Sequence, residues 1–418
     1  MPNIIIQAGS PIVTPGSCPG VTQFKVDTEG LKIKKIGQST FSPFIAKGLN
    51  YAPTPAGCDP NRSRAYCPVN DIAMAKWFAN EFNLIKGNTI RVYWNPIAQT
   101  GIGNPNADQY SYPGTGGTGD SEGSLDSFAA LRFADEMYAK GIHILWNIYV
   151  SFPNWWGPGE PQSRAKQANY EAKITNNILN CATVMKNHPA TMGYIFGNET
   201  NLRYGDLTSP PLGNWNNLTT WFQMANRVLK EVKIIDPCHL TVVSSGGGST
   251  AINGLIIAEN AGLLPDVDLH GLNVYRGADW TAGGSVANLW NQWNPINNKK
   301  TIILECGQVS TDSTGASLNA MQTSEVTGMW QNQNLSKNVG ICYFSAFSEY
   351  WKSGNLGIAP TNDGQYTSSY FTANSADFWQ KNGTAPEQRF GWLENYNSTP
   401  NSTPPTKLPV WTAMGNIW

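Results

Sequence analysis

The chain has 418 residues, of which 28 are Lys or Arg and 29 are Asp or Glu, so its formal charge is -1 and only 14% of its side chains are charged. A balance of this kind gives no general attraction to phosphate or to an anionic membrane surface, which argues against a nucleic-acid partner. Because 40% of the residues are hydrophobic, with 16 Trp, 16 Tyr and 15 Phe, the composition predicts a folded, aromatic-rich globule. No run of about 18 apolar residues occurs, so we expect no membrane span.

The N-terminal part, residues 1–43, is expected to be a lead-in segment with one β-hairpin near Phe24 to Ile36. Its first residues lack the basic region and the long apolar run of a signal peptide. Either the protein is not exported by that route or the given chain is a trimmed form.

Residues 44–365 alternate between short apolar runs, rich in β-branched and aromatic residues, and longer helical patterns. The predicted strands are 44–51, 89–94, 143–150, 192–199, 240–246, 269–275, 301–307 and 339–347. The predicted helices are 71–86, 126–140, 165–186, 218–235, 251–261 and 317–333, with start signals at Asn70-Asp71 and Ser124-Leu125-Asp126.

Eight such alternations favour an α/β fold of the (β/α)8 TIM-barrel type as a single domain. Periodicity alone leaves an open, doubly wound sheet as the alternative, since both folds use strands that are apolar on both faces. Residues 366–418 are rich in Asn, Ser, Thr and Pro, and we interpret them as loops packed on the barrel that end in a mobile segment.

The seven cysteines include no C-x-x-C pair, which argues against a zinc site built from them. Cys58 and Cys67 flank a polar loop, where a local disulfide and two free thiols are equally consistent with the sequence. Cys181, Cys306 and Cys342 lie in apolar segments and are predicted to be buried thiols.

Two predicted strands carry a glutamate at or near their ends: the fourth ends at Glu199, and the seventh closes with Glu305-Cys306-Gly307. The active site of such a barrel lies at the C-terminal ends of its strands. A carboxylate there is costly to bury unless it is hydrogen-bonded or used, and two in one barrel mouth push each other's pKa apart. A retaining glycosidase needs this arrangement, with one carboxyl as acid/base and one as nucleophile, about 5 to 5.5 Å apart.

The Asn-Glu pair on the fourth strand and the Glu on the seventh resemble the clan of retaining glycoside hydrolases with (β/α)8 barrels. Segments 88–93 (NTIRVY), 47–51 (KGLNY), 197–199 (GNE) and 354–358 (GNLGI) are similar to fungal β-1,3-glucanosyltransferases. Segment 344–352 (FSAFSEYWK) resembles the strand-eight motif of endo-β-1,3-glucanases, with Ser348 where an aspartate is usual. Glu305 is followed by Cys306, where these families usually carry Tyr or Thr.

The resemblance implies Glu199 as acid/base and Glu305 as nucleophile. It implies that Asn198 binds the sugar 2-hydroxyl, that Tyr275 holds the nucleophile carboxylate, and that Arg91 keeps this carboxylate ionised through a charge-assisted hydrogen bond.

Other residues near the predicted strand ends are candidates for sugar binding. Glu349 and Lys352 are candidates for contacts to hydroxyl groups, with a surface ion pair as the equal alternative. Pyranose rings present an apolar face to aromatic side chains. The candidates for such stacking are Tyr51, Tyr93, Trp94, Trp146, Tyr149, Trp155, Trp156, Trp280 and Trp351. Trp155, Trp156 and Trp280 are favoured over Trp146 because they lie in Gly/Pro-rich loops rather than in a strand.

Rival motifs are weak. Residues 114–119 fit G-x-G-x-x-G, but no helix-forming run follows, so we interpret them as a loop over the barrel mouth. The four histidines lack metal-ligand spacing, and no G-x-S-x-G elbow is present. We therefore expect no metal and no cofactor. His270, on the sixth strand, is interpreted as a satisfied inner-barrel residue.

The sequence thus predicts a retaining glycoside hydrolase or transglycosylase, expected to be a monomer, that acts on a neutral polysaccharide or oligosaccharide, foremost a β-1,3-glucan. It leaves open hydrolysis against transfer, endo against exo action, and β-1,4 or β-mannose linkages. The alternative is a catalytically idle barrel that serves as a carbohydrate-binding or structural module. A polysaccharide substrate favours an extracellular or cell-wall location, and N-x-S/T sequons such as those at Asn217, Asn382, Asn397 and Asn401 suit it.

Overall fold

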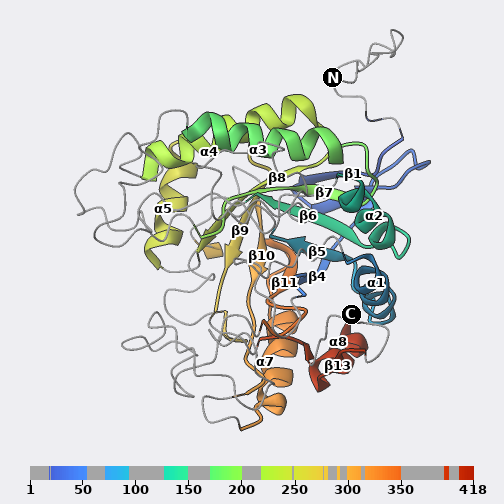
Figure 1. The fold of residues 1–418 in the computed structure, drawn as a ribbon. Coiled ribbons are helices and arrows are strands. Elements are labelled where there is room, and N and C mark those ends of the chain that lie inside the picture. Colours follow the sequence, from blue (N-terminus) through green and yellow to red (C-terminus); the bar gives the residue numbers. More distant parts are fainter. Residues whose placement is uncertain are drawn as a thin grey trace, which may run out of the picture.

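The computed structural model shows a closed barrel of eight parallel strands surrounded by helices (Figure 1). This architecture confirms the predicted (β/α)8 TIM barrel and excludes the open sheet. The residues that the structure describes are 18, 20–53, 71–93, 127–148, 170–199, 218–246, 249–275, 277–280, 290–291, 299–311, 316–349, 390–394 and 404–418.

The barrel strands follow one another in chain order, and the last pairs with the first. They are β4 (Ala46–Asn50), β5 (Thr89–Val92), β6 (His143–Ile148), β7 (Thr191–Phe196), β8 (Leu240–Gly246), β9 (Leu269–Asn273), β10 (Lys300–Glu305) and β11 (Asn338–Tyr343). Each lies within a few residues of a predicted apolar run. Both faces of these strands are buried, which is why the runs are continuously apolar rather than alternating.

The helices between them also match the helical patterns of the sequence. They are α1 (Ile72–Leu84), α2 (Ser127–Tyr138), α3 (Tyr170–Met185), α4 (Leu218–Ile235), α5 (Ser249–Asn260) and α7 (Asn319–Gln331). The start signal before α1 is confirmed, because the Asp71 side chain accepts a hydrogen bond from the Met74 backbone N–H at 2.9 Å. Within the described residues, no helix combines the length and the hydropathy needed to cross a bilayer.

Two hydrophobic clusters hold the barrel together. Inward-facing side chains such as Leu145, Val242 and Leu304 fill its interior, while outward-facing ones such as Trp146 and Phe196 pack beneath the helices. The interior is therefore a packed core, and the site chemistry is confined to its C-terminal end.

The predicted N-terminal hairpin is confirmed and closes the opposite end of the barrel. Strands β1 (Gln23–Asp27) and β2 (Gly30–Lys34) pair antiparallel, and β3 (Ser42–Pro43) extends the sheet. Phe24, Leu31 and Ile33 on this sheet join the same buried cluster as the inward-facing barrel residues. The hairpin thus acts as a hydrophobic plug.

The expectation of loops near the C-terminus is wrong for the residues described there. β12 (Leu393–Glu394) pairs with β13 (Thr406–Lys407), and α8 (Pro409–Ile417) follows. Figure 1 shows α8 between α7 and α1, where the eighth barrel helix belongs. Trp411 of α8 packs on Phe78 and Phe82 of α1, and Trp418 packs on Trp330 of α7. The pattern was missed because this helix is short and begins 66 positions after the end of its strand, counted from Tyr343 to Pro409.

His270 is buried as expected, but it lies on the outer side of the barrel wall. Its Nε2 is 2.8 Å from Oε1 of Glu259 on α5, and this carboxylate also accepts a hydrogen bond from Lys299 Nζ at 2.9 Å. The assignment to the barrel interior is therefore wrong, because side chains alternate along β9 and Asn273 takes the inward direction.

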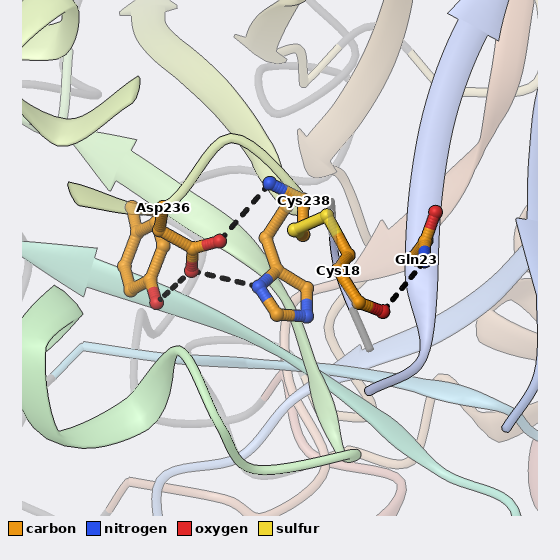
Figure 2. Close-up of a disulfide and its surroundings, with 6 residues drawn as sticks. Cys18, Gln23, Asp236 and Cys238 are labelled. Carbon is orange, nitrogen blue, oxygen red and sulfur yellow. Dashed lines mark hydrogen bonds and ion pairs between the residues drawn. A yellow bond between two sulfur atoms is a disulfide. The ribbon is translucent and has the colours of Figure 1, made fainter. Parts of the chain in front are cut away.

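A disulfide between Cys18 and Cys238 joins the N-terminal segment to the loop before β8 (Figure 2). Neighbouring hydrogen bonds support it: Gln23 Nε2 donates to the Cys18 carbonyl at 2.9 Å, and the Asp236 carboxylate accepts from the Cys238 backbone N–H at 3.1 Å. Cys181, Cys306 and Cys342 are buried free thiols, as predicted, whereas Cys58 and Cys67 lie outside the described residues.

Because the cysteines are 220 residues apart, their disulfide closes a very long loop in the unfolded chain. The chain-entropy relation gives about 5 kcal/mol for such a loop, and removal of native disulfides costs roughly 2–5 kcal/mol. We expect Cys238→Ser to lower the free energy of unfolding by an amount in this range, measured by urea denaturation. Cys18→Ser should cost the same, and the double variant little more. Additive losses would contradict the disulfide.

Candidate active site

Arg91, on β5, occupies the centre of the C-terminal end of the barrel and is fully buried. Its Nε and Nη2 donate to Asn147 Oδ1 at 2.9 and 2.6 Å, and Nη2 also donates to Asn198 Oδ1 at 2.8 Å. Nη1 donates to Glu305 Oε1 at 2.8 Å and to the Leu304 carbonyl at 3.2 Å. A guanidinium has five N–H donors, so these contacts use all of them and fix its plane.

Glu305 ends β10 and is only 6% exposed. Its Oε1 accepts hydrogen bonds from Arg91 Nη1 and, at 2.7 Å, from the Tyr93 hydroxyl. Its Oε2 accepts one hydrogen bond from the Tyr275 hydroxyl at 2.8 Å. Three donors, one of them cationic, therefore stabilise an ionised carboxylate at this position.

The two tyrosines are donors because they stay protonated. Burial, and then the charge of Glu305, raises the pKa of Tyr93 well above its usual value, and the charge of Glu349 adds to this. Burial and then the charge of Glu305 likewise raise the pKa of Tyr275, to which the charge of Glu199 contributes. The three carboxylates thus act on the same pair of phenols at one end of the barrel.

The turn after β7 carries the second catalytic candidate. Gly197 has φ 76° and Glu199 has φ 52°, a left-handed conformation that is unusual for a residue with a side chain. Between them, Asn198 Oδ1 accepts hydrogen bonds from Arg91 Nη2 and from Asn273 Nδ2, the latter at 2.9 Å. Because both partners are hydrogen-bond donors, the Asn198 atom that faces them must be the amide oxygen, and the amide nitrogen points away from Arg91.

The structure therefore brings together Arg91, Asn198, Tyr275 and Glu305, with Glu199 beside them. It also gives Tyr93 a contact that the sequence did not indicate, because its hydroxyl donates to Glu305 while its ring lies 4.5 Å from the Arg91 guanidinium carbon. Glu349 follows β11 and is only 5% exposed.

The expectation of sugar stacking is corrected for Tyr51 and Trp280. Tyr51 is completely buried, with its ring packed among Phe78, Phe133 and Phe347. Trp280 is 3% exposed, and its indole N–H donates to the Met329 carbonyl at 2.9 Å. Neither ring offers an open face, because both complete the hydrophobic layer outside the barrel wall.

Several candidates lie outside the described residues: Trp94, Tyr149, Trp155, Trp156, Trp351, Lys352 and the glycine-rich segment 114–119. Trp146, which the sequence disfavoured as a stacking platform, is fully buried. Among the described residues, no group of three or more His, Cys, Asp and Glu side chains is placed to hold a metal ion.

Two further site residues, Asn147 and Asn273, were missed. Asn147 lies near the end of β6 and Asn273 is the last residue of β9, and both are buried. The signal that could have found them is the one that marked the glutamates, a polar side chain at the end of an apolar strand.

No protein-family model and no curated protein matches the chain. Solved structures do match it. ScGas2 in complex with compound 8 has 14% sequence identity and a TM-score of 0.53, with 95% of this chain and 67% of that chain covered. A GH2 β-galacturonidase from Eisenbergiella tayi has 12% identity and a TM-score of 0.53, over 95% and 54%. The β-D-glucuronidase of Dictyoglomus thermophilum has 13% identity and a TM-score of 0.51, over 96% and 54%.

At these identities the comparisons show a shared fold. The chain has the (β/α)8 barrel that these two glycosidases and ScGas2 also contain, which supports the resemblance to glycosidase barrels at that level. The chain spans 54% of the length of each of the two glycosidases and 67% of the length of ScGas2.

The buried Arg91–Glu305 contact can be tested by stability alone. Arg91→Met leaves the Glu305 carboxylate buried without its countercharge, which typically costs 3–5 kcal/mol, so we expect roughly this loss in urea denaturation. Arg227→Met is the matched control: Arg227 also contacts a carboxylate through two nitrogens, on Glu171, but these side chains are 52% and 32% exposed. Its loss should stay below about 1 kcal/mol. Equal losses would contradict the buried pair.

Proposed function

We propose that the protein is a retaining glycoside hydrolase or transglycosylase that acts on a neutral polysaccharide through a glycosyl-Glu305 intermediate. The observation that carries the proposal is the hydrogen bonding of Glu305, which accepts from Arg91, Tyr93 and Tyr275 at the mouth of a glycosidase-like barrel. A purely structural carboxylate has no need of this donor set next to a second carboxyl group.

The two Glu305 oxygens have different surroundings. Oε1 accepts two hydrogen bonds, whereas Oε2 accepts one from within the described residues. Oε2 therefore keeps a lone pair for the anomeric carbon. In the first step the bond from C1 to Oε2 forms, the glycosidic bond breaks, and a proton passes from Glu199 to the leaving oxygen.

In the second step Glu199 takes a proton from the attacking hydroxyl group, the new C1–O bond forms, and the bond from C1 to Oε2 breaks. Water as the attacking group gives hydrolysis, and a sugar hydroxyl gives transfer. Asn198 is positioned to donate through Nδ2 to the 2-hydroxyl of the sugar, because its Oδ1 is already used by Arg91 and Asn273. The carboxyl separation of about 5 to 5.5 Å that retention requires stays a prediction.

The charges support a neutral sugar. Glu199, Glu305 and Glu349 surround the site, and every donor of Arg91, the cation that contacts Glu305, is already used. Within the described residues, a uronate carboxylate would meet net negative charge. We assign the substrate as a β-1,3-glucan on the sequence motifs, and we assign sugar contacts to Glu349 and, beyond the described residues, to Trp155, Trp156, Trp351 and Lys352.

We further propose an extracellular or cell-wall location and a monomeric protein. The disulfide between Cys18 and Cys238 supports the location, because such bonds persist in oxidising compartments.

The direct test is mass spectrometry of the products formed from a defined β-1,3-gluco-oligosaccharide. Products longer than the input would establish transfer, and shorter products alone would establish hydrolysis. Glu305→Gln should lower turnover by several orders of magnitude and keep sugar binding, because it removes the nucleophile with little change in shape. If the unaltered protein converts none of the oligosaccharides with β-1,3, β-1,4 or β-mannose linkages, the enzyme proposal is wrong and the protein is a binding module instead.

The acid/base role is tested with Glu199→Ala and an activated aryl glycoside. Such a substrate forms the intermediate without an acid, but the second step then lacks its base. We expect added azide to restore part of the rate, because azide attacks without needing a base, and to yield a glycosyl azide. Failure of azide to accelerate this variant would count against Glu199.

A further inference from the structure

The side chain of Asn147 connects the two halves of the candidate active site. It lies on β6, between the strand that carries Arg91 and the strand that leads to Glu199, and it is fully buried. Its Oδ1 accepts both Arg91 Nε and Arg91 Nη2, at 2.9 and 2.6 Å. Its Nδ2 donates to the Gly197 carbonyl at 3.1 Å.

The two ends of this amide cannot be exchanged. Arg91 offers donors only, so the oxygen of Asn147 must face it, and the Gly197 carbonyl is an acceptor, so the nitrogen must face the turn. Through Arg91 the amide is linked to the Glu305 carboxylate at 2.8 Å, and through Gly197 it is linked to the peptide that precedes Asn198. One rigid side chain therefore spans the distance between the nucleophile side and the acid/base side.

The turn after β7 has an unusual backbone conformation that needs a stabilising contact such as the hydrogen bond from Asn147. Glu199 holds φ 52°, a conformation that an L-residue keeps only where its surroundings impose it. The carbonyl that Asn147 binds lies at the start of this turn, where Gly197 has φ 76°. This hydrogen bond ties the start of the turn that carries Glu199 to β6.

We propose that Asn147 is a positioning residue that sets the acid/base turn against the nucleophile. The inference rests on the proposed glycosidase function. The Nδ2 of Asn147 acts on Glu199 through the Gly197 carbonyl, and its Oδ1 acts on Glu305 through Arg91. A general acid must lie within about 2.6–3.2 Å of the oxygen that it protonates. A misplacement of about 1 Å can cost roughly 10²-fold in rate.

A positioning role can be distinguished from a merely structural one by how far the loss of kcat/KM depends on the leaving group of the substrate. Asn147→Asp keeps oxygen acceptors for Arg91 but replaces the donor to Gly197 with an oxygen that repels the carbonyl. We expect kcat/KM to fall roughly 10²-fold for phenyl β-laminaribioside, whose leaving group needs a proton. For the dinitrophenyl glycoside, which leaves as a stable anion, the fall should be at least 10-fold smaller. A loss common to both substrates is expected from the new charge beside Arg91.

In the Glu199→Ala background, Asn147→Asp should leave the ratio of the two rates unchanged, because no acid remains to be misplaced. Asn332→Asp is the matched control: Asn332 Nδ2 also donates to a backbone carbonyl, that of Ala278 at 3.0 Å, outside the site. This control should keep the activity and the leaving-group dependence of the unaltered protein.

Should Asn147→Asp fail to fold, Asn147→Ser provides the second variant: its shorter side chain withdraws the donor from Gly197, and what it loses at Arg91 is expected to affect both substrates alike. Equal losses for both substrates, or an unchanged leaving-group dependence in a folded variant, would overturn the assignment of Asn147. If the unaltered protein cleaves neither these glycosides nor the corresponding β-1,4-glucoside and β-mannoside, the proposed function fails, and the inference fails with it.

Discussion

The arrangement of the site depends on one buried guanidinium, that of Arg91, whose N–H donors are all used in hydrogen bonds. Arg91 uses its five N–H donors on side chains or carbonyls from three other strand ends: Asn147, Asn198, and Leu304 with Glu305. Burying an ion pair is costly unless hydrogen bonds compensate each partner, and here every donor of Arg91 is used and Glu305 accepts three hydrogen bonds. Because the fork of the guanidinium is planar and rigid, satisfying it also fixes the relative positions of the residues that surround it. The same contacts that make the buried charge tolerable therefore pre-organise the carboxylate that is proposed to react.

The rest of the fold supports this centre from below and closes the opposite end of the barrel. Inward-facing aliphatic side chains fill the barrel below Arg91, and the hairpin of β1 and β2 closes its far end with Phe24, Leu31 and Ile33. The disulfide from Cys18 to Cys238 holds that end to the loop before β8. Since the interior is tightly packed, a polar cluster is tolerated only where the strands end and solvent is near.

Much of this was accessible from the sequence, for identifiable reasons. Strands buried on both faces are continuously apolar, so all eight were found, and the pattern of β10 placed Glu305 near a strand end. Arg91 was assigned through the resemblance of its segment to known enzymes. Helix α8 was missed because a short amphipathic segment far from its strand carries little periodicity. Tyr51 and Trp280 were assigned to sugar stacking because composition near a strand end does not reveal which way a ring points.

The sequence by itself determined the eight alternations of strand and helix and the pair of glutamates near strand ends, because hydrophobic periodicity and polar strand ends are local properties of the chain. It favoured the barrel, and the tertiary structure decided between the barrel and the open sheet. The tertiary structure alone decided which partners these groups have. Tyr93 donates to Glu305 because closure of the barrel brings the ends of β5 and β10 together. Asn147 connects Arg91 with Gly197 because β6 pairs with β5 and β7, and Cys18 pairs with Cys238 because the N-terminal segment packs beside the loop before β8; these contacts join residues that lie far apart in the chain. Hydrogen bonds and disulfides require directions and distances of a few ångströms, and linear spacing does not contain them.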